Sequence, residues 1–392
     1  MKTIKVSFPN KHQEILTGRL EMSIVERPKQ FALFIHCFTC NKNLNAVKQI
    51  SRSLAKKGIG VLRFDFTGLG ESEGDFSDTN FSGNIDDIIS AAKFLETHYK
   101  APSLIVGHSF GGTASIYAGH VLDSVKAIAT IGSPSRPEHV KHLFKNQLDT
   151  INTSGVAEVN IGGRPFSIKK QFIDDLEHTP IHEIVGAKQK ALLVLHSPSD
   201  QVVELKNAEE IYKLAKHPKS FISLDGADHL LTNKIDAEYA SEIISSWVTR
   251  YIQTQEEKTI DNKAQVNAQL ISENNFTTKI TAGKHHLIAD EPKSIGGKDL
   301  GPAPYELVSS GLAACTVMTL QMYAQRKQWP LERVDVHINH EKALDEDGKK
   351  IDVFEKEILI YGDLTEKQKE RLLEISKKCP VHKTLSQSSI LK

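Results

Sequence analysis

Three residues, Ser109, Asp200 and His229, are of types that can together form an activated nucleophile, and each follows an apolar run. Ser109 is the centre of Gly-His-Ser-Phe-Gly, between an apolar run at 103–106 and a helix-compatible stretch. A serine hydroxyl is a weak nucleophile until an imidazole takes its proton and a carboxylate orients that imidazole. The sequence therefore predicts Ser109 as nucleophile, His229 as general base and Asp200 as the orienting carboxylate.

Two alternatives remain open at this point. A glycine-rich turn between a strand and a helix could carry Ser109 without using it, because Gly-x-Ser-x-Gly by itself is common. Asp225 or Asp228 could orient His229 in place of Asp200, although neighbouring side chains such as 228 and 229 rarely face each other.

The charge that develops on a carbonyl oxygen during acyl transfer needs backbone N–H donors. The expected donors are the N–H groups of Phe110, directly after the nucleophile, and of Phe38, in the loop after the apolar run 31–35. Cys37 and Cys40 in this loop form a C-x-x-C. A redox pair would need to open a helix and a zinc site would need a second pair, so buried structural thiols are expected.

The first 253 residues alternate between short apolar runs and helical patterns, which predicts an α/β fold with a doubly wound, mostly parallel sheet. Histidines 36, 108 and 196 end or follow such runs and are expected to hold loops there. The expected strands are 3–8, 17–25, 31–35, 58–64, 103–106, 125–131, 191–196 and 220–224, and the main helices are 43–57, 83–98, 204–216 and 234–253.

A polar segment at 133–190 interrupts the alternation. An insertion there would lie over the carboxyl ends of the strands, where ligands bind in such sheets. We expect a lid that shapes the substrate pocket; a solvated excursion without function is the alternative. Residues 254–265 are charged and poor in apolar side chains, which predicts a linker between a domain at 1–253 and one at 266–392.

The first domain resembles the α/β-hydrolase family, in which nucleophile, acid and histidine follow one another in the chain order Ser109, Asp200, His229. Many members carry His-Gly in the loop after the third strand, whereas Cys37 follows His36 here. The resemblance implies hydrolysis of a carboxylic ester or related acyl compound through an acyl-enzyme.

The segment 266–392 has α+β character, with short strands followed by two helices that flank a strand pair. It contains Gly-Pro-Ala-Pro before the first helix, Ala-Ala-Cys within that helix and Cys-Pro after the second. The expected strands are 266–272, 276–281, 285–289, 332–341 and 351–361, and the helices are 305–327 and 365–378. These features resemble the OsmC/Ohr family of thiol-dependent hydroperoxide reductases, in the form fused behind an α/β hydrolase.

That resemblance implies a homodimer through this domain and an organic hydroperoxide as substrate. It also implies that Cys315 is the peroxidatic thiolate and Cys379 the resolving thiol, which cycle through a sulfenic acid and a disulfide. Family members place a glutamate ten residues before the first cysteine, where this chain has Tyr305, with Glu306 next to it. No arginine lies between residues 250 and 326; Lys284, Lys298 or His285 could substitute for it.

Composition narrows the classes of partner, cofactor and cellular location that the protein can have. The 392 residues carry 49 lysines and arginines against 49 aspartates and glutamates, which gives no reason to expect nucleic acid or an anionic membrane as partner. No stretch is expected to reach membrane-spanning length, and no metal cluster or nucleotide loop predicts a cofactor. Four cysteines form no disulfide framework and are expected to be reduced thiols of a cytoplasmic protein.

The sequence thus predicts a serine hydrolase that acts on a small acyl ester, fused to a domain with thiol peroxidase potential. Two other functions stay open. In one, the thiol reductase is the working half and the hydrolase fold only delivers substrate. In the other, the protein binds ligands without catalysis, which the missing arginine and glutamate and the presence of Cys37 favour.

Overall fold

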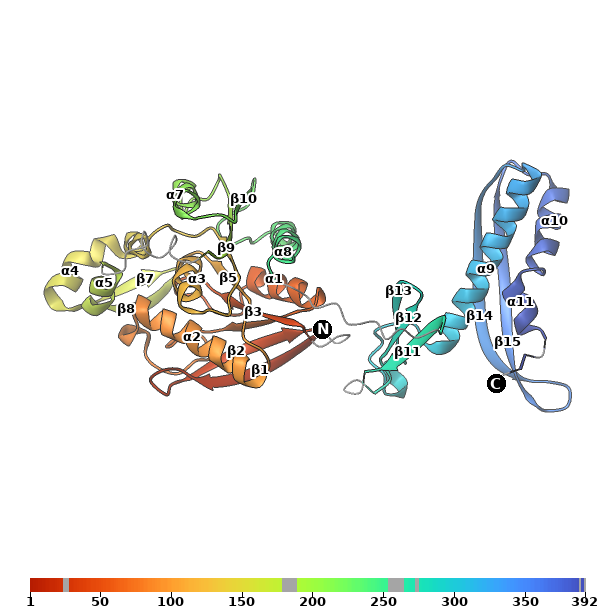
Figure 1. Ribbon diagram of the computed structural model, residues 1–392, viewed down its shortest axis with the longest axis horizontal. Coiled ribbons are helices and arrows are strands. Elements are labelled where there is room, and N and C mark those ends of the chain that lie inside the picture. The colour runs from red at the N-terminus through yellow and green to blue at the C-terminus, as the bar shows by residue number, and fades with distance from the viewer. Residues whose placement is uncertain (24–27, 178–188, 253–263, 272–274, 388, 391–392) are drawn as a thin grey trace. The chain divides into compact units, whose positions relative to one another are not determined.

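The computed structural model describes residues 1–23, 28–177, 189–252, 264–271, 275–387 and 389–390. The chain forms two compact units, Met1–Thr259 and Ile260–Lys392 (Figure 1). The division falls within the predicted linker 254–265, most of which lies outside the described residues.

An eight-stranded sheet is the centre of the first unit, with the order β1-β2-β4-β3-β5-β6-β9-β10. β1 and β2 pair antiparallel with each other and β2 pairs antiparallel with β4, whereas every later neighbour is parallel. The predicted mostly parallel sheet is confirmed. The strands are β1 (Lys2–Pro9), β2 (Ile15–Met22), β3 (Gln30–Ile35), β4 (Ile59–Phe64), β5 (Leu104–His108), β6 (Ala127–Ile131), β9 (Ala191–His196) and β10 (Lys219–Ser223).

Helices cover both faces of this sheet, which explains why its central strands are buried at every position (Figure 1). In β3, Leu33 and Ile35 face a core that includes α2 (Phe81–His98) and α3 (Phe110–Val121). Ala32 and Phe34 face the opposite core, formed with α1 (Asn45–Lys56) and α8 (Lys234–Val248). α7 (Lys206–Leu214) joins the first core through Ala208 and Ile211.

The inserted segment after β6 folds as part of the first unit. Val140, Phe144, Ile151 and Phe172 are buried in the same core as α2 and α3, so the alternative of a solvated excursion is wrong for the described part, because its apolar side chains are shared with the domain core. Residues 178–188 of the predicted lid lie outside the described residues. The elements are η2 (Pro137–Gln147), α4 (Leu148–Ser154), the antiparallel pair β7 (Val156–Ile161) and β8 (Arg164–Lys169), and α5 (Lys170–Glu177).

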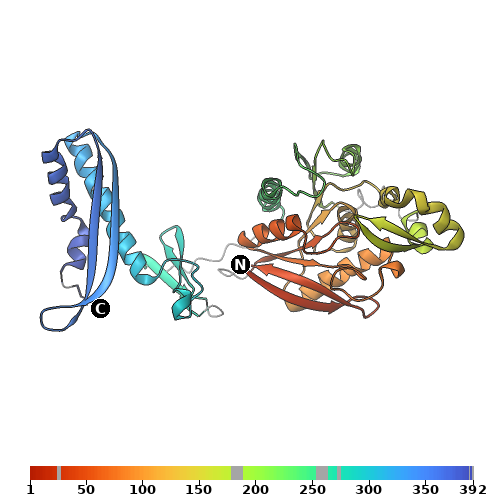
Figure 2. The same ribbon diagram turned by 180° about the vertical axis from the view of Figure 1, so that it is seen from behind.

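The second unit contains a small three-stranded sheet and a long hairpin with helices against it (Figure 2). Residues Leu320, Ala324, Leu364, Leu372 and Ile375 form its small core, where α9 meets α10. The elements are β11 (Val266–Leu270), β12 (Thr278–Ala282), β13 (His285–Ala289), α9 (Pro304–Lys327), β14 (Leu331–Leu344), β15 (Lys350–Gly362), α10 (Glu366–Ser376) and α11 (Pro380–Leu385).

By length and composition alone, α9 is a helix that could cross a membrane, and it is the one such helix among the described residues. The expectation that no stretch reaches spanning length is therefore wrong. A helix in the core of a soluble domain passes the same test, so this single helix is weak evidence for a membrane span.

Candidate active site

Ser109 lies at the sharp turn between β5 and α3. Its backbone has φ 53° and ψ −127°, a conformation that non-glycine residues rarely adopt and that costs roughly 1–3 kcal/mol. Strand and helix approach each other closely here: a Cβ at Gly107 would lie 2.5 Å from the Gly112 Cα, and a Cβ at Gly112 would meet Ser133. The glycines therefore allow the turn to present the Ser109 hydroxyl at the end of the strand.

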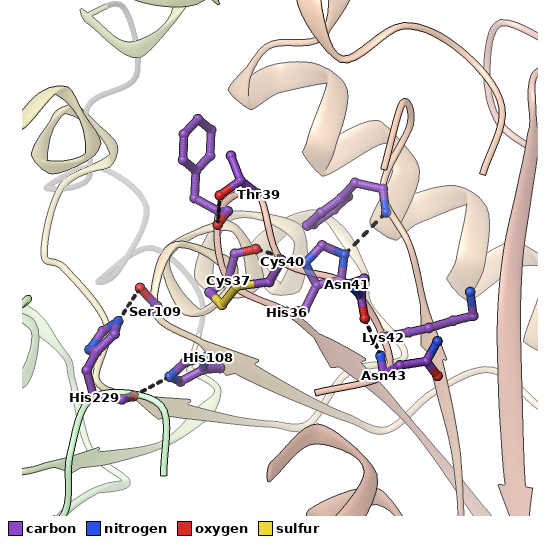
Figure 3. Close-up of a disulfide and its surroundings, with 12 residues drawn as sticks. His36, Cys37, Thr39, Cys40, Asn41, Lys42, Asn43, His108, Ser109 and His229 are labelled. Carbon is purple, nitrogen blue, oxygen red and sulfur yellow. Dashed lines mark hydrogen bonds between the residues drawn. A yellow bond between two sulfur atoms is a disulfide. The ribbon is translucent and has the colours of Figure 1, made fainter. Parts of the chain in front are cut away.

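The three predicted residues come together in one line of hydrogen bonds. The Ser109 Oγ and His229 Nε2 are 3.0 Å apart, and the His229 Nδ1 and Asp200 Oδ2 are 2.7 Å apart (Figure 3 shows the Ser109–His229 contact). Asp200 follows β9 and His229 follows β10, so both lie beyond the carboxyl ends of parallel strands. This is the geometry in which an imidazole can take the serine proton while a carboxylate holds its tautomer.

Asp200 is held as a carboxylate by its surroundings. Burial by itself raises the pKa of Asp200, but hydrogen bonds from His229 and from the backbone N–H groups of Val202 and Val203 outweigh it and lower that pKa. Neither alternative carboxylate serves His229: Asp228 accepts hydrogen bonds from Thr232, and Asp225 accepts one from Ser223.

The three histidines expected to hold loops do so. The His108 Nε2 donates to the carbonyl of His229 at 2.7 Å, and the His196 Nε2 donates to the carbonyl of Val203 at 2.8 Å. His36 donates from Nδ1 to the carbonyl of Cys37 at 2.8 Å. Burial is the main cause that lowers the pKa of each ring, to about 3 for His108, so these rings are neutral at ordinary pH.

The loop after β3 packs directly on the first turn of α3. A Cβ at Gly111 would lie 2.3 Å from the carbonyl oxygen of His36, and the rings of Phe38 and Phe110 are 5.2 Å apart. The N–H of Phe110 belongs to the first turn of α3, which has no acceptor within the helix. Among the described residues, none accepts a hydrogen bond from the N–H of Phe38. The two predicted oxyanion donors thus lie on adjoining segments.

Cys37 and Cys40 form a disulfide in this loop, with 5.3 Å between their Cα atoms (Figure 3). The expectation of reduced structural thiols is therefore wrong for this pair. The physical reason is a tight turn: the N–H of Cys40 bonds the carbonyl of Cys37 at 3.2 Å, and Thr39 takes a positive φ of 56°. The turn places the two sulfurs within bonding reach. Cys315 and Cys379 are free thiols.

Aromatic side chains from separate segments gather around Phe38 and Phe110. Phe38 contacts Phe110 and also Phe76 and Phe172, with ring centroids 5.2 to 5.6 Å apart. Phe166 of β8 contacts Phe76 at 5.0 Å. Phe166 and Phe172 belong to the inserted segment, so the described part of the predicted lid joins a cluster that extends to Phe110, the residue after Ser109. No periodicity in the sequence pointed to this cluster.

In the second unit, Cys315 of α9 lies close enough to Cys379, which precedes α11, for each thiol to shift the pKa of the other. Burial by itself raises the pKa of Cys379, but hydrogen bonds from the Cys315 thiol and from the N–H groups of His382 and Val381 lower it. Burial and the bond to Cys379 raise the pKa of Cys315. The two thiols therefore titrate as an interacting pair, and the assignment of Cys315 as the attacking thiolate stays a prediction.

Lys356 of β15 is a further charged neighbour of the two cysteines, which the sequence did not single out. Its Nζ donates to the carbonyl of Ser376 at 3.2 Å, and burial lowers the pKa of Lys356. Glu306 accepts a hydrogen bond from the N–H of Ala303 at 2.7 Å, so it caps the start of α9. Glu306 is thus used as a helix cap, and the position ten residues before Cys315, where the OsmC/Ohr pattern has its glutamate, is Tyr305.

Comparison with known proteins gives the family of each unit. Residues 27–156 match the model of serine aminopeptidase, S33, and residues 296–391 match that of OsmC-like protein. The esterase domain of a Rhodothermus marinus protein is 46% identical, covers 64% of this chain and 99% of its own, and superposes with a TM-score of 0.54. The chain belongs to the α/β-hydrolase esterases. Its second unit is an OsmC-like domain.

Two more distant curated relatives match the esterase unit. Uncharacterized protein YfhR of Salmonella typhimurium is 24% identical over 64% of this chain and 81% of its own length. Palmitoyl-protein thioesterase ABHD10, mitochondrial, of Mus musculus is 22% identical over 50% of this chain and 67% of its own. The esterase unit is therefore a hydrolase enzyme by family.

Proposed function

We infer that Ser109, His229 and Asp200 are the catalytic triad of this esterase. The line of hydrogen bonds from the Ser109 Oγ through His229 to Asp200 is the observation that carries the inference. His229 takes the serine proton at Nε2 while the oxygen attacks the acyl carbonyl, and Asp200 stabilises the imidazolium that forms. The same proton then passes to the departing alcohol or thiol. Water, activated by His229, releases the acyl group from Ser109 in the second half-reaction.

The backbone N–H groups of Phe38 and Phe110 would bind the developing oxyanion. They lie on two adjoining segments, and neither is committed to another acceptor in the described structure. Such preorganised donors stabilise charge that appears only in the transition state.

The substrate class that this site suits is an ester or thioester with an apolar or aromatic acyl group. The half-buried rings of Phe38, Phe76 and Phe166 offer apolar surface that extends from Phe110, the residue after Ser109. A relative named as a palmitoyl-protein thioesterase supports thioesters as a second leaving-group class.

The test uses the full chain and its Ser109→Ala variant with a fluorophosphonate probe and p-nitrophenyl esters of increasing acyl length. Labelling and turnover are expected in the wild type, with turnover about 10⁴-fold or more lower in the variant. A parallel series of acyl thioesters separates the two leaving-group classes. A wild type as inert as the variant would overturn the assignment and favour a non-catalytic binding role.

The second unit carries a second candidate activity, the thiol-dependent reduction of organic hydroperoxides. The observation that favours it is the contact between Cys315 and Cys379, which sequence alone places 64 residues apart. A thiolate attacks the peroxide O–O bond, becomes a sulfenic acid and releases an alcohol. The other cysteine then displaces water from that sulfenic acid and closes a disulfide, which a dithiol reduces.

Single variants decide which cysteine acts first. Cys315 is the more exposed of the two and is therefore the more accessible to a hydroperoxide, whereas Cys379 is buried. After cumene hydroperoxide, sulfenic acid should persist in the variant that retains the attacking cysteine, either Cys379→Ser or Cys315→Ser. If the wild type turns over hydroperoxide with a dithiol while Ser109 reacts with no ester or fluorophosphonate, the thiol reductase is favoured as the working half. Absence of sulfenic acid in both variants would contradict this activity.

Assembly of two copies through the OsmC-like unit accounts for apolar surface that one protomer leaves exposed. Met318 and Met322 of α9 are 64% and 70% exposed, and every residue of β11 is exposed. A three-stranded sheet needs a covered apolar face for stability. A homodimer that buries these surfaces predicts a mass of two chains in light scattering, and Met318→Glu/Met322→Glu should yield a single chain. A monomeric wild type would contradict it.

A further inference from the structure

The Cys37–Cys40 disulfide closes the loop that supplies a predicted oxyanion donor. Cys37 is buried and Cys40 is half-buried, so one sulfur is enclosed while the other residue reaches the surface. Phe38 and Thr39 are the two residues between them. Because the bond joins the ends of a four-residue turn, the backbone N–H of Phe38 lies inside the ring that the disulfide closes.

The turn inside this ring is held in a conformation that its residues do not favour by themselves. Thr39, a β-branched residue, has a φ of 56° and is buried. A β-branched side chain in this region is a backbone outlier that persists where surrounding bonds enforce it. The carbonyl of Cys37 accepts from the N–H of Cys40 and from His36, and Arg164 of the insertion donates to the carbonyl of Thr39.

The same loop lies against the nucleophile turn. The carbonyl of His36 touches the backbone of Gly111 so closely that no side chain fits there, and the Phe38 ring contacts the ring of Phe110. Figure 3 shows the disulfide in one view with the Ser109–His229 pair. A change in the turn therefore alters the backbone that faces the reacting carbonyl, while the bonds among Ser109, His229 and Asp200 involve none of its atoms.

We propose that the Cys37–Cys40 disulfide is a redox-sensitive positioning element of the esterase, which holds the Phe38 N–H in the oxyanion hole when oxidised and releases it when a dithiol reduces the bond. The proposal rests on the proposed function of Ser109 and of the Phe38 N–H. In the reduced state the attacking serine and its base remain in place, but one of the two donors to the oxyanion is no longer held.

The redox step is an ordinary thiol–disulfide exchange. A thiolate of the external dithiol attacks the sulfur of the more exposed Cys40, and the Cys37 sulfur leaves as a thiolate that takes up a proton. The second thiol of the reductant then displaces Cys40 from the mixed disulfide. Two electrons pass to the protein, which gains two thiols, and the dithiol becomes a disulfide. An oxidised dithiol reverses the reaction.

The experiment uses the full-length Cys315→Ser/Cys379→Ser variant, because Cys37 and Cys40 are then its only cysteines. The protein is equilibrated with mixtures of reduced and oxidised dithiothreitol, its thiols are counted by alkylation and mass spectrometry, and p-nitrophenyl ester turnover is measured on the same samples. Each redox state is compared only with the other state of the same variant. Thermal unfolding of both states is recorded alongside.

The expected result is a kcat roughly 10- to 100-fold lower in the reduced state, since loss of one oxyanion donor costs about 10²–10³ in kcat. KM should change by less than about threefold, because a donor used in the transition state contributes little to ground-state binding. Reoxidation should restore kcat. The Cys37→Ser/Cys40→Ser variant, which cannot form the bond, should have the low kcat and no response to dithiothreitol.

Equal kcat in the two states, with two thiols counted in one and none in the other, would overturn the proposal. A loss of thermal stability without a change in kcat would make the disulfide merely structural, and overturns it as well. These results differ from failure of the proposed function, in which neither redox state labels with fluorophosphonate. Because the main comparison leaves the loop sequence unaltered, it does not depend on folding of the Cys37→Ser/Cys40→Ser variant.

Discussion

The ring of His108 donates a hydrogen bond from Nε2 to the backbone carbonyl of His229, at 2.7 Å. The residue directly before Ser109 therefore holds the loop that carries His229. Burial is the main cause that lowers the pKa of His108 to about 3, and the neighbouring His229 adds to it. The contact joins the end of β5 to the loop after β10 without using a charge.

Replacing His108 by Gln should flatten the acid branch of the stability profile. Below pH 6.5 this histidine is protonated in the unfolded chain but stays neutral in the folded chain. The free energy of unfolding therefore falls as the pH falls from about 6.5 toward 3. One such group contributes about 1.4 kcal/mol per pH unit. Urea unfolding of the esterase unit at several pH values measures the slope. His12→Gln, at an exposed site, should keep the wild-type slope, and an unchanged slope in His108→Gln contradicts the prediction.

Asp200→Asn should lower kcat by about 10⁴-fold while the fold and KM change little, because the amide stabilises the wrong tautomer of His229. Steady-state kinetics with a p-nitrophenyl ester give the measurement. Asp225→Asn is the matched control, since Asp225 bonds Ser223 in the same region, and its kcat should stay within about threefold of wild type. Equal losses in both variants would show that Asp200 is not the orienting carboxylate.

Gly132→Ala should impair catalysis beyond its effect on stability. Gly132 has a φ of 54°, and a Cβ there would lie 3.2 Å from the Asp200 Oδ2 and 3.3 Å from the His229 Nδ1. We expect kcat to fall by about tenfold or more, because small displacements of catalytic groups are costly. Gly155→Ala is the control. Gly155 has a φ of 80° and open space around it, so an added Cβ there strains the backbone but contacts no other residue. Similar kcat values in the two variants would refute the prediction.

Phe166→Ala should weaken binding of esters with apolar acyl groups. Its half-buried ring contacts Phe76 within the aromatic cluster around Phe38 and Phe110, so its removal should raise KM for longer acyl chains by roughly 3- to 10-fold, with a smaller effect on acetate. Comparison of kcat/KM along a p-nitrophenyl ester series tests this. Phe94→Ala removes a half-buried ring that stacks on Phe8 and should leave the chain-length profile unchanged. A parallel loss for all esters would argue against a role in specificity.

Lys356→Met should shift the titration of the Cys315–Cys379 pair to higher pH, because a positive charge near the thiolate disappears. Thiolate absorbance near 240 nm as a function of pH gives the titration in the full chain. Lys350→Met, on the same strand but exposed, is the control and should titrate as wild type. No shift in Lys356→Met would mean that the lysine is too well solvated to act on the pair.

Much of the architecture follows from local pattern. Continuous apolar runs such as 31–35 and 103–106 predicted buried parallel strands, and the structure confirms them as β3 and β5. The placement of Asp200 and His229 after successive strands predicted that both would reach Ser109, because carboxyl ends of parallel strands share one edge of the sheet. These features depend on periodicity and chain order, which sequence carries directly.

Other features depend on how distant segments pack, and only the tertiary structure decided them. The Cys37–Cys40 disulfide closes a turn in which Thr39 has a positive φ, and a C-x-x-C does not specify such a turn. The cluster around Phe38 joins residues that precede β5 in the chain with residues that follow β6. Lys356, on β15 of the hairpin, is a charged neighbour of the two cysteines. Burial periodicity tells which face of an element is covered, but not which side chain covers it. The sequence by itself therefore determined the elements and the order of the triad, and packing decided what surrounds each reactive group.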